Sequence, residues 1–203
     1  MSKPATLQFT QDWFHWAPEL WEQITPTLPA RKSFLEIGSF EGRSMAWAVE
    51  HMVEDGGAIT CIDTWEGGEE HAKLDKQLLE KTFEHNARVV RRMFPNREIR
   101  KAKGTSYQML TVLATQPDSE FDFIYVDGSH LAKDVLSDAC LSWPMLKRGG
   151  VMVFDDYMWG DRRDALHRPK MAIDAFTSLF AEEVSLMHVG YQCIIQKLIG
   201  DTK

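Results

Sequence analysis

The chain has 203 residues, of which 44% are hydrophobic and 26% charged, the proportions of an ordinary soluble globular protein. This length predicts a single domain over residues 1–203, a net charge of −7 argues against nonspecific nucleic-acid binding, and no apolar run approaches the roughly 20 residues that span a membrane. Residues 1–6, Met-Ser-Lys-Pro-Ala-Thr, lack the apolar stretch of a signal peptide, so we expect a cytoplasmic protein.

The first predicted element is an amphipathic helix within residues 9–28. Large apolar side chains recur there at helical spacing, at Phe9, Trp13, Phe14, Trp16, Leu20 and Trp21. Such a helix must bury its aromatic face, and two roles are open: packing on the main core, or forming a lid over a substrate pocket. Residues 1–32 are therefore interpreted as an N-terminal cap, which Pro26 and Pro29 separate from the predicted sheet.

From residue 33 onward, strand-like runs alternate with helical patterns, which is typical of a doubly wound α/β sheet. The predicted strands are 33–37, 58–63, 98–102, 121–127, 150–155, 184–189 and 191–197. The predicted helices are 43–54, 70–93, 105–115, 131–146 and 169–180. The last two strands are joined tightly through Gly190, and so short a connection permits only an antiparallel pair.

Three cysteines, Cys61, Cys140 and Cys193, are widely spaced, odd in number and set in apolar surroundings. This usage is more typical of buried free thiols than of disulfides or a metal site.

The turn after the first strand carries the most informative pattern, Phe-Leu-Glu-Ile-Gly-Ser-Phe-Glu-Gly-Arg-Ser at residues 34–44. Gly38 and Gly42 suit a sharp turn that a ligand approaches closely, and the next helix presents unpaired N–H groups. Glu36 makes a phosphate an unfavourable neighbour but suits a ligand with an ammonium group and sugar hydroxyls. S-adenosylmethionine is such a ligand.

Residues 36–44 resemble the first motif, E-x-G-x-x-x-G-x-S, of class I S-adenosylmethionine-dependent methyltransferases. The likeness runs from about residue 33 to the C-terminus and is greatest to the catechol and macrolide or aminocoumarin sugar O-methyltransferases. The resemblance implies a three-layer, Rossmann-like α/β fold with a seven-stranded, mostly parallel sheet, one antiparallel strand and helices on both faces. Residues 33–203 would form the cofactor-binding core.

Polar residues at the strand ends complete the predicted cofactor site. Asp63 ends the second strand, where an acid accepts ribose hydroxyls in methyltransferases and dinucleotide-binding folds alike. The resemblance adds Trp65, as a cover for adenosine or a wall of the acceptor pocket, and residues 105–107 as adenine contacts. The predicted cofactor-binding residues are Glu36, Gly38, Ser39, Phe40, Gly42, Ser44, Asp63, Thr64, Trp65, Thr105, Ser106, Tyr107, Asp127 and His130. A turn acid and a helix cap are the structural alternatives for Asp63 and Thr105.

Asp127 ends the fourth strand, and Asp155 and Asp156 end the fifth. Crowded carboxylates repel one another or take up protons unless a cation neutralises them, and oxygen ligands suit Mg²⁺. The related enzymes hold Mg²⁺ with acids at these positions, so we predict that the three aspartates bind Mg²⁺, which would position and acidify an acceptor hydroxyl. The alternative is that Asp127 only orients the cofactor and the pair Asp155 and Asp156 caps a turn. His130 is the candidate general base, with a contact to adenine as its alternative; Asp127 and His130 are thus the predicted catalytic residues.

The predicted reaction is methyl transfer from S-adenosylmethionine to a hydroxyl of a small molecule, with no nucleic-acid or membrane partner and a homodimer as one option. The loop at 157–169 supplies acceptor candidates, Tyr157, Trp159, Arg162, Arg163 and His167, whereas His71 is interpreted as a cap or a catalytic group. Alternatives are a metal-independent N- or C-methyltransferase, a nicotinamide-dependent oxidoreductase, and a non-catalytic module that binds a partner through the basic run at 88–103. A solvated surface is the other interpretation of that run.

Overall fold

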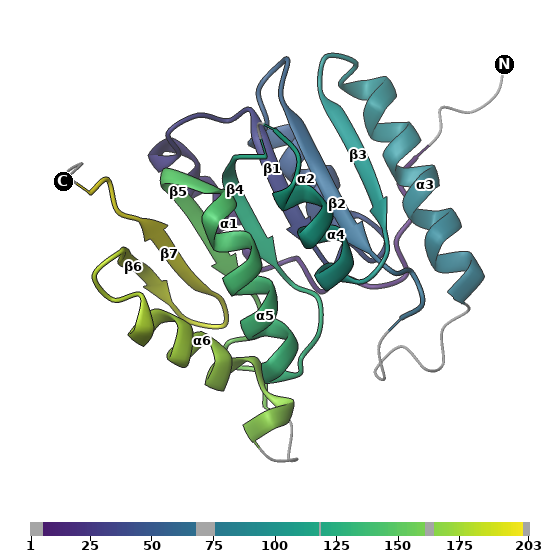
Figure 1. Ribbon diagram of the computed structural model, residues 1–203. Coiled ribbons are helices and arrows are strands. Elements are labelled where there is room, and N and C mark those ends of the chain that lie inside the picture. The colour runs from purple at the N-terminus through teal and green to yellow at the C-terminus, as the bar shows by residue number, and fades with distance from the viewer. Residues whose placement is uncertain (1–5, 68–75, 118, 161–164, 201–203) are drawn as a thin grey trace, which may run out of the picture.

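The structure of the protein is a computed structural model that describes residues 6–67, 76–117, 119–160 and 165–200 (Figure 1). Its centre is a seven-stranded sheet. The strands are β1 (Ser33–Ile37), β2 (Ala58–Asp63), β3 (Glu98–Lys103), β4 (Phe121–Val126), β5 (Leu146–Phe154), β6 (Val184–Val189) and β7 (Cys193–Lys197). All seven predicted strands are therefore present, and the largest difference is that β5 begins four residues earlier than expected.

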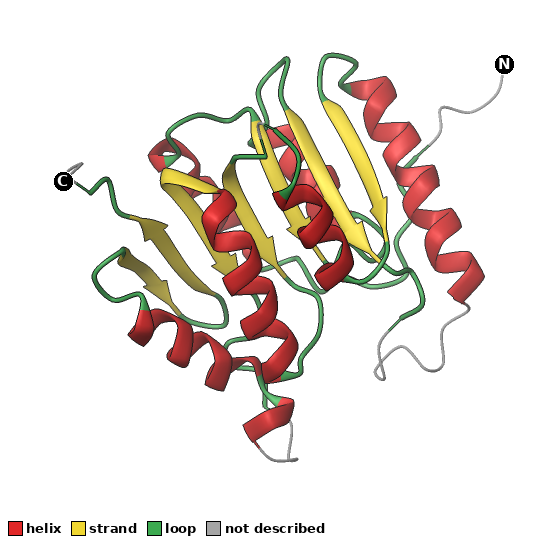
Figure 2. Ribbon diagram, in the orientation of Figure 1, coloured by secondary structure: helices red, strands yellow, loops and turns green. Residues whose placement is uncertain are grey.

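The sheet has the strand order β3-β2-β1-β4-β5-β7-β6. Strands β1 to β5 pair in parallel, whereas β7 runs antiparallel to both of its neighbours, β5 and β6 (Figure 2). The strand order reverses direction between β1 and β4, and ligands of open α/β sheets bind at such a switch point, beyond the carboxyl ends of the strands. The predicted Rossmann-like sheet with one antiparallel strand is confirmed.

Helices cover both faces of the sheet because its central strands are apolar on both sides. In β4, Phe123 and Tyr125 face a core shared with the N-terminal helices, whereas Ile124 and Val126 face a second core. The first layer holds α1 (Ala17–Ile24), α2 (Arg43–His51) and α3 (Lys76–Met93), and the second holds α4 (Ser106–Ala114), α5 (Ala132–Ser142) and α6 (Pro169–Leu179). Among the described residues, none of the helices has the length and apolar composition that crossing a membrane requires.

The predicted N-terminal helix over residues 9–28 is wrong in extent. The observed helix α1 covers only Ala17–Ile24, followed by a 3₁₀ turn at Thr25–Thr27. Pro18 explains the late start, because proline fits the first turn of a helix but breaks hydrogen bonding in its interior. Trp21 is nonetheless buried against β4, with its ring centroid 5.0 Å from Phe123, so the core-packing role holds for this part.

The preceding residues 6–13 form an extended strap across α2 and α3. Glu41 accepts hydrogen bonds from the backbone N–H and the hydroxyl of Thr10, at 2.7 and 2.8 Å. Asn86 on α3 exchanges two hydrogen bonds with the backbone of Gln8, at 2.8 and 2.7 Å. The strap ends at Trp13, whose ring centroid lies 5.1 Å from that of Phe40 in the loop after β1. The N-terminal segment therefore reaches the edge of the predicted cofactor site.

Two further expectations need correction. The predicted helix at 131–146 ends at Ser142 and is followed by a 3₁₀ turn at Trp143–Met145, because Pro144 cannot donate the N–H that a continuing helix requires. Cys61 and Cys193 are buried free thiols as expected, but Cys140, also free, is exposed. The start of the predicted helix at 70–93 lies outside the described residues before Lys76.

Candidate functional site

The loop between β1 and α2 is held close to the end of β4 by Gly38. This residue has φ +88°, and a Cβ added there would lie 2.0 Å from the carbonyl oxygen of Asp127. Gly42, with φ +77°, is the N-cap of α2, and its added Cβ would meet Met45 and Phe83 instead of open space. Both glycines are required, the first for close approach of two strand ends and the second for the entry into α2.

Glu36 lies at the end of β1 with 2% of its surface exposed. Its Oε1 accepts a hydrogen bond from the Ser44 hydroxyl at 2.5 Å, whereas Oε2 is buried without a hydrogen-bond partner. The buried hydroxyl of Ser39 lies close enough to favour the charged carboxylate, yet it also lacks a partner. Burial raises the pKa of Glu36 above its ordinary value. An unused acceptor and an unused hydroxyl thus lie together at the glycine loop.

Asp63 fastens the same loop from the end of β2. Its Oδ2 accepts the backbone N–H groups of Ser39 and Phe40, at 2.9 and 2.8 Å, and its Oδ1 accepts the N–H of Trp65 at 2.7 Å. The turn-acid interpretation is therefore confirmed. Each carboxylate oxygen can accept more than one hydrogen bond, so this role is compatible with ribose binding, which stays a prediction.

Trp65 is buried against the core, and its predicted role as a cover for adenosine or a wall of the acceptor pocket stays a prediction. Its indole is 2% exposed, packs 4.7 Å from the ring of Phe83 and donates its Nε1–H to the carbonyl of Phe40 at 2.9 Å. Trp65 therefore anchors the loop between β1 and α2 to the core. Thr64 accepts the N–H of Glu66 at 3.1 Å, and His71 lies outside the described residues.

The turn after β3 places residues 105–107 at the start of α4. Thr105 is the N-cap and accepts the N–H of Gln108 at 3.3 Å, as the capping interpretation expects. Tyr107 is 63% exposed. Ser106 lies close enough to Asp138 on α5 to favour the charged form of this buried acid, which sequence reasoning did not identify. The only sequence signal for Asp138 is a carboxylate at an otherwise inward-facing position of a helix.

The structure brings the three predicted aspartates together. Burial and the negative charges of Asp155 and Asp156 raise the pKa of Asp127 well above its ordinary value. Burial and the charge of Asp156 raise the pKa of Asp155 to about 7. Asp155 accepts hydrogen bonds from the Tyr125 hydroxyl and, at 2.8 Å, from the N–H of Asp156. The cluster therefore has the mutual repulsion that its sequence positions predict.

Asp156 also contacts two side chains across the site. Its Oδ2 lies 2.7 Å from Nε2 of His130, and its Oδ1 accepts the Tyr191 hydroxyl at 2.8 Å. Trp159 packs on the His130 ring, with centroids 4.3 Å apart. Tyr191 comes from the short β6–β7 connection and was missed, because only the antiparallel pairing of β5 and β7 brings it here. Arg162 and Arg163 lie outside the described residues.

The aspartate cluster offers the oxygen donors that Mg²⁺ prefers. In the part of the chain that the structure describes, however, no group of three or more such side chains is already arranged around a metal position. A cation would compete with Tyr125, His130 and Tyr191 for the oxygens of Asp155 and Asp156. The donor chemistry fits Mg²⁺, and the predicted magnesium site stays a prediction.

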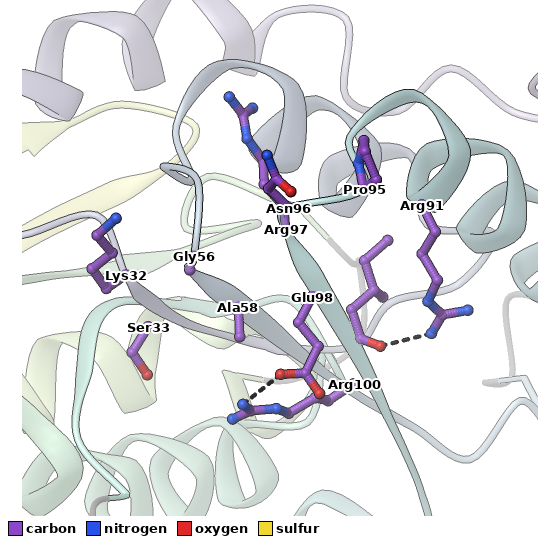
Figure 3. Close-up of a pocket in the computed structure, with 12 residues that line it drawn as sticks. Lys32, Ser33, Gly56, Ala58, Arg91, Pro95, Asn96, Arg97, Glu98 and Arg100 are labelled. Atoms are coloured by element: carbon purple, nitrogen blue, oxygen red, sulfur yellow. Dashed lines mark hydrogen bonds and ion pairs between the residues drawn. The ribbon is translucent and has the colours of Figure 1, made fainter.

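A basic pocket of about 590 Å³ lies at the opposite, amino-terminal edge of the sheet (Figure 3). Its arginines are engaged locally: Arg91 donates to the carbonyl of Ile99 at 2.6 Å, and Arg100 pairs with Glu98 at 2.6 Å. Lys101, farther along the same basic run, pairs with glutamates of α3. This arrangement agrees with a solvated surface better than with a partner site, and it is remote from the strand ends described above.

Residues 35–157 match the family model of a methyltransferase domain. Among solved structures, the O-methyltransferase NovP is 18% identical, with a TM-score of 0.64 over 90% of this chain and 79% of that chain. An O-methyltransferase from Bacillus cereus in complex with SAH is 19% identical, with a TM-score of 0.63 over 94% of this chain and 84% of that one.

The MycE methyltransferase of mycinamycin biosynthesis, solved with Mg, SAH and mycinamycin VI, is 17% identical, with a TM-score of 0.60 over 94% of this chain and 51% of its own. A search of curated proteins finds no match to this sequence. The solved structures support the fold, and the family model spans more than half of the chain, from within β1 through β2 and β4 to the aspartate cluster. The protein belongs to the methyltransferase-domain family.

Proposed function

We propose that the protein transfers the methyl group of S-adenosylmethionine to a hydroxyl oxygen of a small molecule. The observation that carries the proposal is the buried, unpartnered Oε2 of Glu36 beside the glycine loop, within the segment that matches the methyltransferase family. A buried acceptor without a donor costs about 1–3 kcal/mol, and an ammonium group is the donor that a carboxylate pairs with best. The 2-amino group of the methionine moiety supplies that donor.

The same loop holds the other parts of the cofactor. Gly38 brings the backbone of β1 against that of β4, the unpartnered Ser39 hydroxyl is available for hydrogen bonding, and Asp63 can accept a ribose hydroxyl besides the N–H groups that it already binds. When bound, S-adenosylmethionine supplies an electrophilic methyl group on a sulfonium. The residues of the loop orient it, and orientation accounts for a large part of the rate of a direct displacement.

His130 is the group that we assign to accept the proton of the hydroxyl. Because the carboxylate of Asp156 only accepts hydrogen bonds, the neutral His130 ring directs its Nε2–H toward Asp156, 2.7 Å away, and keeps its lone pair on Nδ1. Asp156 thereby orients the ring and stabilises it once Nδ1 is protonated. Packing of Trp159 against the ring limits its rotation.

Asp127, Asp155 and Asp156 are the residues that would hold Mg²⁺. The ion would supply positive charge that acidifies a nearby hydroxyl. The raised pKa values of Asp127 and Asp155 support a cation here, since mutual repulsion of carboxylates is what a cation relieves. A bound ion would compete with His130 and Tyr191 for the oxygens of Asp156. Metal binding therefore has to be measured separately from methyl transfer.

The test begins with calorimetric titration of S-adenosylmethionine into the metal-stripped protein. One-to-one binding that is lost in Glu36→Leu and kept in Glu98→Leu, an exposed strand acid at the far edge, supports the proposed cofactor site. Methylation of a panel of catechols, sugar-linked phenols and matched amines, with and without Mg²⁺, then separates O-methylation from N-methylation. Absence of cofactor binding under all conditions would refute the methyltransferase proposal.

The base is tested with His130→Asn against His188→Asn, which alters a histidine on β6. We expect the first variant to bind cofactor normally and to lose about 100-fold or more in kcat, within the range for a general base. The second variant should behave as the parent protein. Equal rates in both variants would remove His130 from the proposed reaction.

A further inference from the structure

Asp138 is a buried carboxylate for which the fold and the proposed methyl transfer give no use so far. It lies on α5, has 2% of its surface exposed, and its Oδ1 is completely buried without a hydrogen-bond partner. Buried polar atoms of proteins almost always have a partner, and leaving an acceptor unpaired costs about 1–3 kcal/mol. The position therefore requires an explanation.

The surroundings of Asp138 place it beside the cofactor site. Gly128 follows the end of β4, and a Cβ added to it would lie 3.5 Å from Oδ2 of Asp138 and 3.5 Å from the side chain of Ile37 at the end of β1. Ser106, at the first turn of α4, lies close enough to stabilise the charged form of Asp138. The carboxyl group thus lies beside the start of α4 and beside Gly128 in the loop that follows β4. This loop borders the switch point between β1 and β4.

The chemistry of S-adenosylmethionine limits which of its groups can bind at Asp138. Under the proposed function, the amino acid part of S-adenosylmethionine is held at Glu36 and the ribose at Asp63, on β1 and β2. The remaining part is the adenine base, and its hydrogen-bond donor is the 6-amino group. A carboxylate is an acceptor in its charged state and keeps one accepting oxygen when protonated.

We propose that Asp138, together with Ser106, accepts a hydrogen bond from the 6-amino group of adenine and makes the site selective for adenosine over 6-oxopurine nucleosides. The inference rests on the proposed function and adds to it a specificity-determining residue from α5. A 6-oxo group in place of the amine would set two acceptors against each other, and sites that lose such a hydrogen bond discriminate strongly.

Burial raises the pKa of Asp138 to about 7, with a further contribution from the negative charge of Asp134. Near neutral pH both protonation states are therefore populated, and each of them provides an oxygen that accepts from the amine. Only the charged carboxylate lacks a donor for a 6-oxo group, because a protonated carboxyl group can donate its proton, so the preference is measured at pH 8.5, where the charged form prevails.

The experiment measures calorimetric affinity for S-adenosylhomocysteine and for S-inosylhomocysteine, which has a 6-oxo group. The parent protein should prefer the adenosyl compound at least tenfold. Asp138→Leu should reduce this preference to about threefold or less, and Asp138→Asn should reduce it too, because an amide can also donate to the 6-oxo group. Glu22→Gln, which removes an exposed acidic charge on α1 in the helix layer on the other face of the sheet, should keep the full preference.

Each outcome decides a different point. If S-adenosylhomocysteine fails to bind the parent protein, the proposed function itself is refuted, and this inference with it. If it binds and both Asp138 variants keep the parent's preference, only the role of Asp138 is refuted. Should Asp138→Leu fail to fold, as shown by loss of a cooperative thermal transition, the preference of Asp138→Asn decides alone.

Discussion

Replacing Asp138 by Asn should make the ligand-free protein more stable at alkaline pH. The carboxyl group has an ordinary pKa of 3.8, which burial raises to about 7 in the folded state. Between these values the folded protein holds a proton that the unfolded chain has released. The stability of the parent protein therefore falls as the pH rises from about 4 to 7, since charging Asp138 costs more in the folded state.

The size of the effect follows from the difference of about three pKa units, which corresponds to roughly 4 kcal/mol at most. About two of these units fall between pH 5 and pH 8, and relaxation around the charged group reduces the effect, so we expect the stability advantage of Asp138→Asn over the parent to grow by about 1–2.5 kcal/mol from pH 5 to pH 8. Other groups titrate in both proteins and cancel in the comparison.

Urea unfolding followed by circular dichroism at pH 5, 6, 7 and 8 measures this difference. Glu22→Gln is the control, since Glu22 is an exposed acid on α1, in the helix layer on the other face of the sheet, and its replacement should shift the stability curve little. A stability difference between Asp138→Asn and the parent that stays constant from pH 5 to pH 8 would refute the argument that Asp138 is forced to ionise in a buried site.

Three more predictions concern the glycine loop, the amino-terminal edge of the sheet and the N-terminal strap. Gly38→Ala should abolish cofactor binding and lower the free energy of unfolding in urea by more than ~3 kcal/mol, because its Cβ would lie 2.0 Å from a backbone oxygen. Gly56→Ala is its control: φ is +80° there too, but the nearest atom to the added Cβ is 4.0 Å away, so this change should cost only about 1 kcal/mol. Asp122→Ala should cost about 3 kcal/mol by the same assay, since this fully buried acid accepts two backbone N–H groups and a lysine, and a result below 1 kcal/mol would contradict that role. Glu41→Ala should release the N-terminal strap and speed amide exchange at Thr10, whose N–H it binds at 2.7 Å; unchanged exchange would show that other contacts hold the strap.

The strand ends that form the site could be predicted from sequence because their signals are local. Each apolar run of β1, β2 and β4 ends in an acid, at Glu36, Asp63 and Asp127, and parallel strands bring these ends to one edge. The aspartate cluster followed from the same argument. Sequence position determines where such residues lie along the sheet, but it does not show which hydrogen bonds they make.

The residues that were missed depend on contacts between distant segments. Tyr191 reaches Asp156 across 35 positions, and the carboxyl group of Asp138 is buried only because the loop after β4 and the start of α4 close over α5. The burial of Trp65 likewise depends on a left-handed φ of +52° and on packing against Phe83, neither of which its sequence neighbours indicate. Local pattern alone does not contain these orientations.

The N-terminal aromatic residues show most clearly why helical spacing misled the prediction. The aromatic side chains of residues 9–21 serve different surfaces: Phe9 lies under the guanidinium of Arg43, Trp13 packs on Phe40, and Trp21 is buried against β4. A single helix presents one such face, so three separate partners require a chain that is extended before it becomes helical. One end of the strap contacts the glycine loop, where we propose that the cofactor binds. Helix α1 packs on Tyr125, whose hydroxyl binds Asp155, so the N-terminal segment links the glycine loop to the aspartate cluster. Its aromatic residues are therefore explained by the site that they border as well as by the core that they fill.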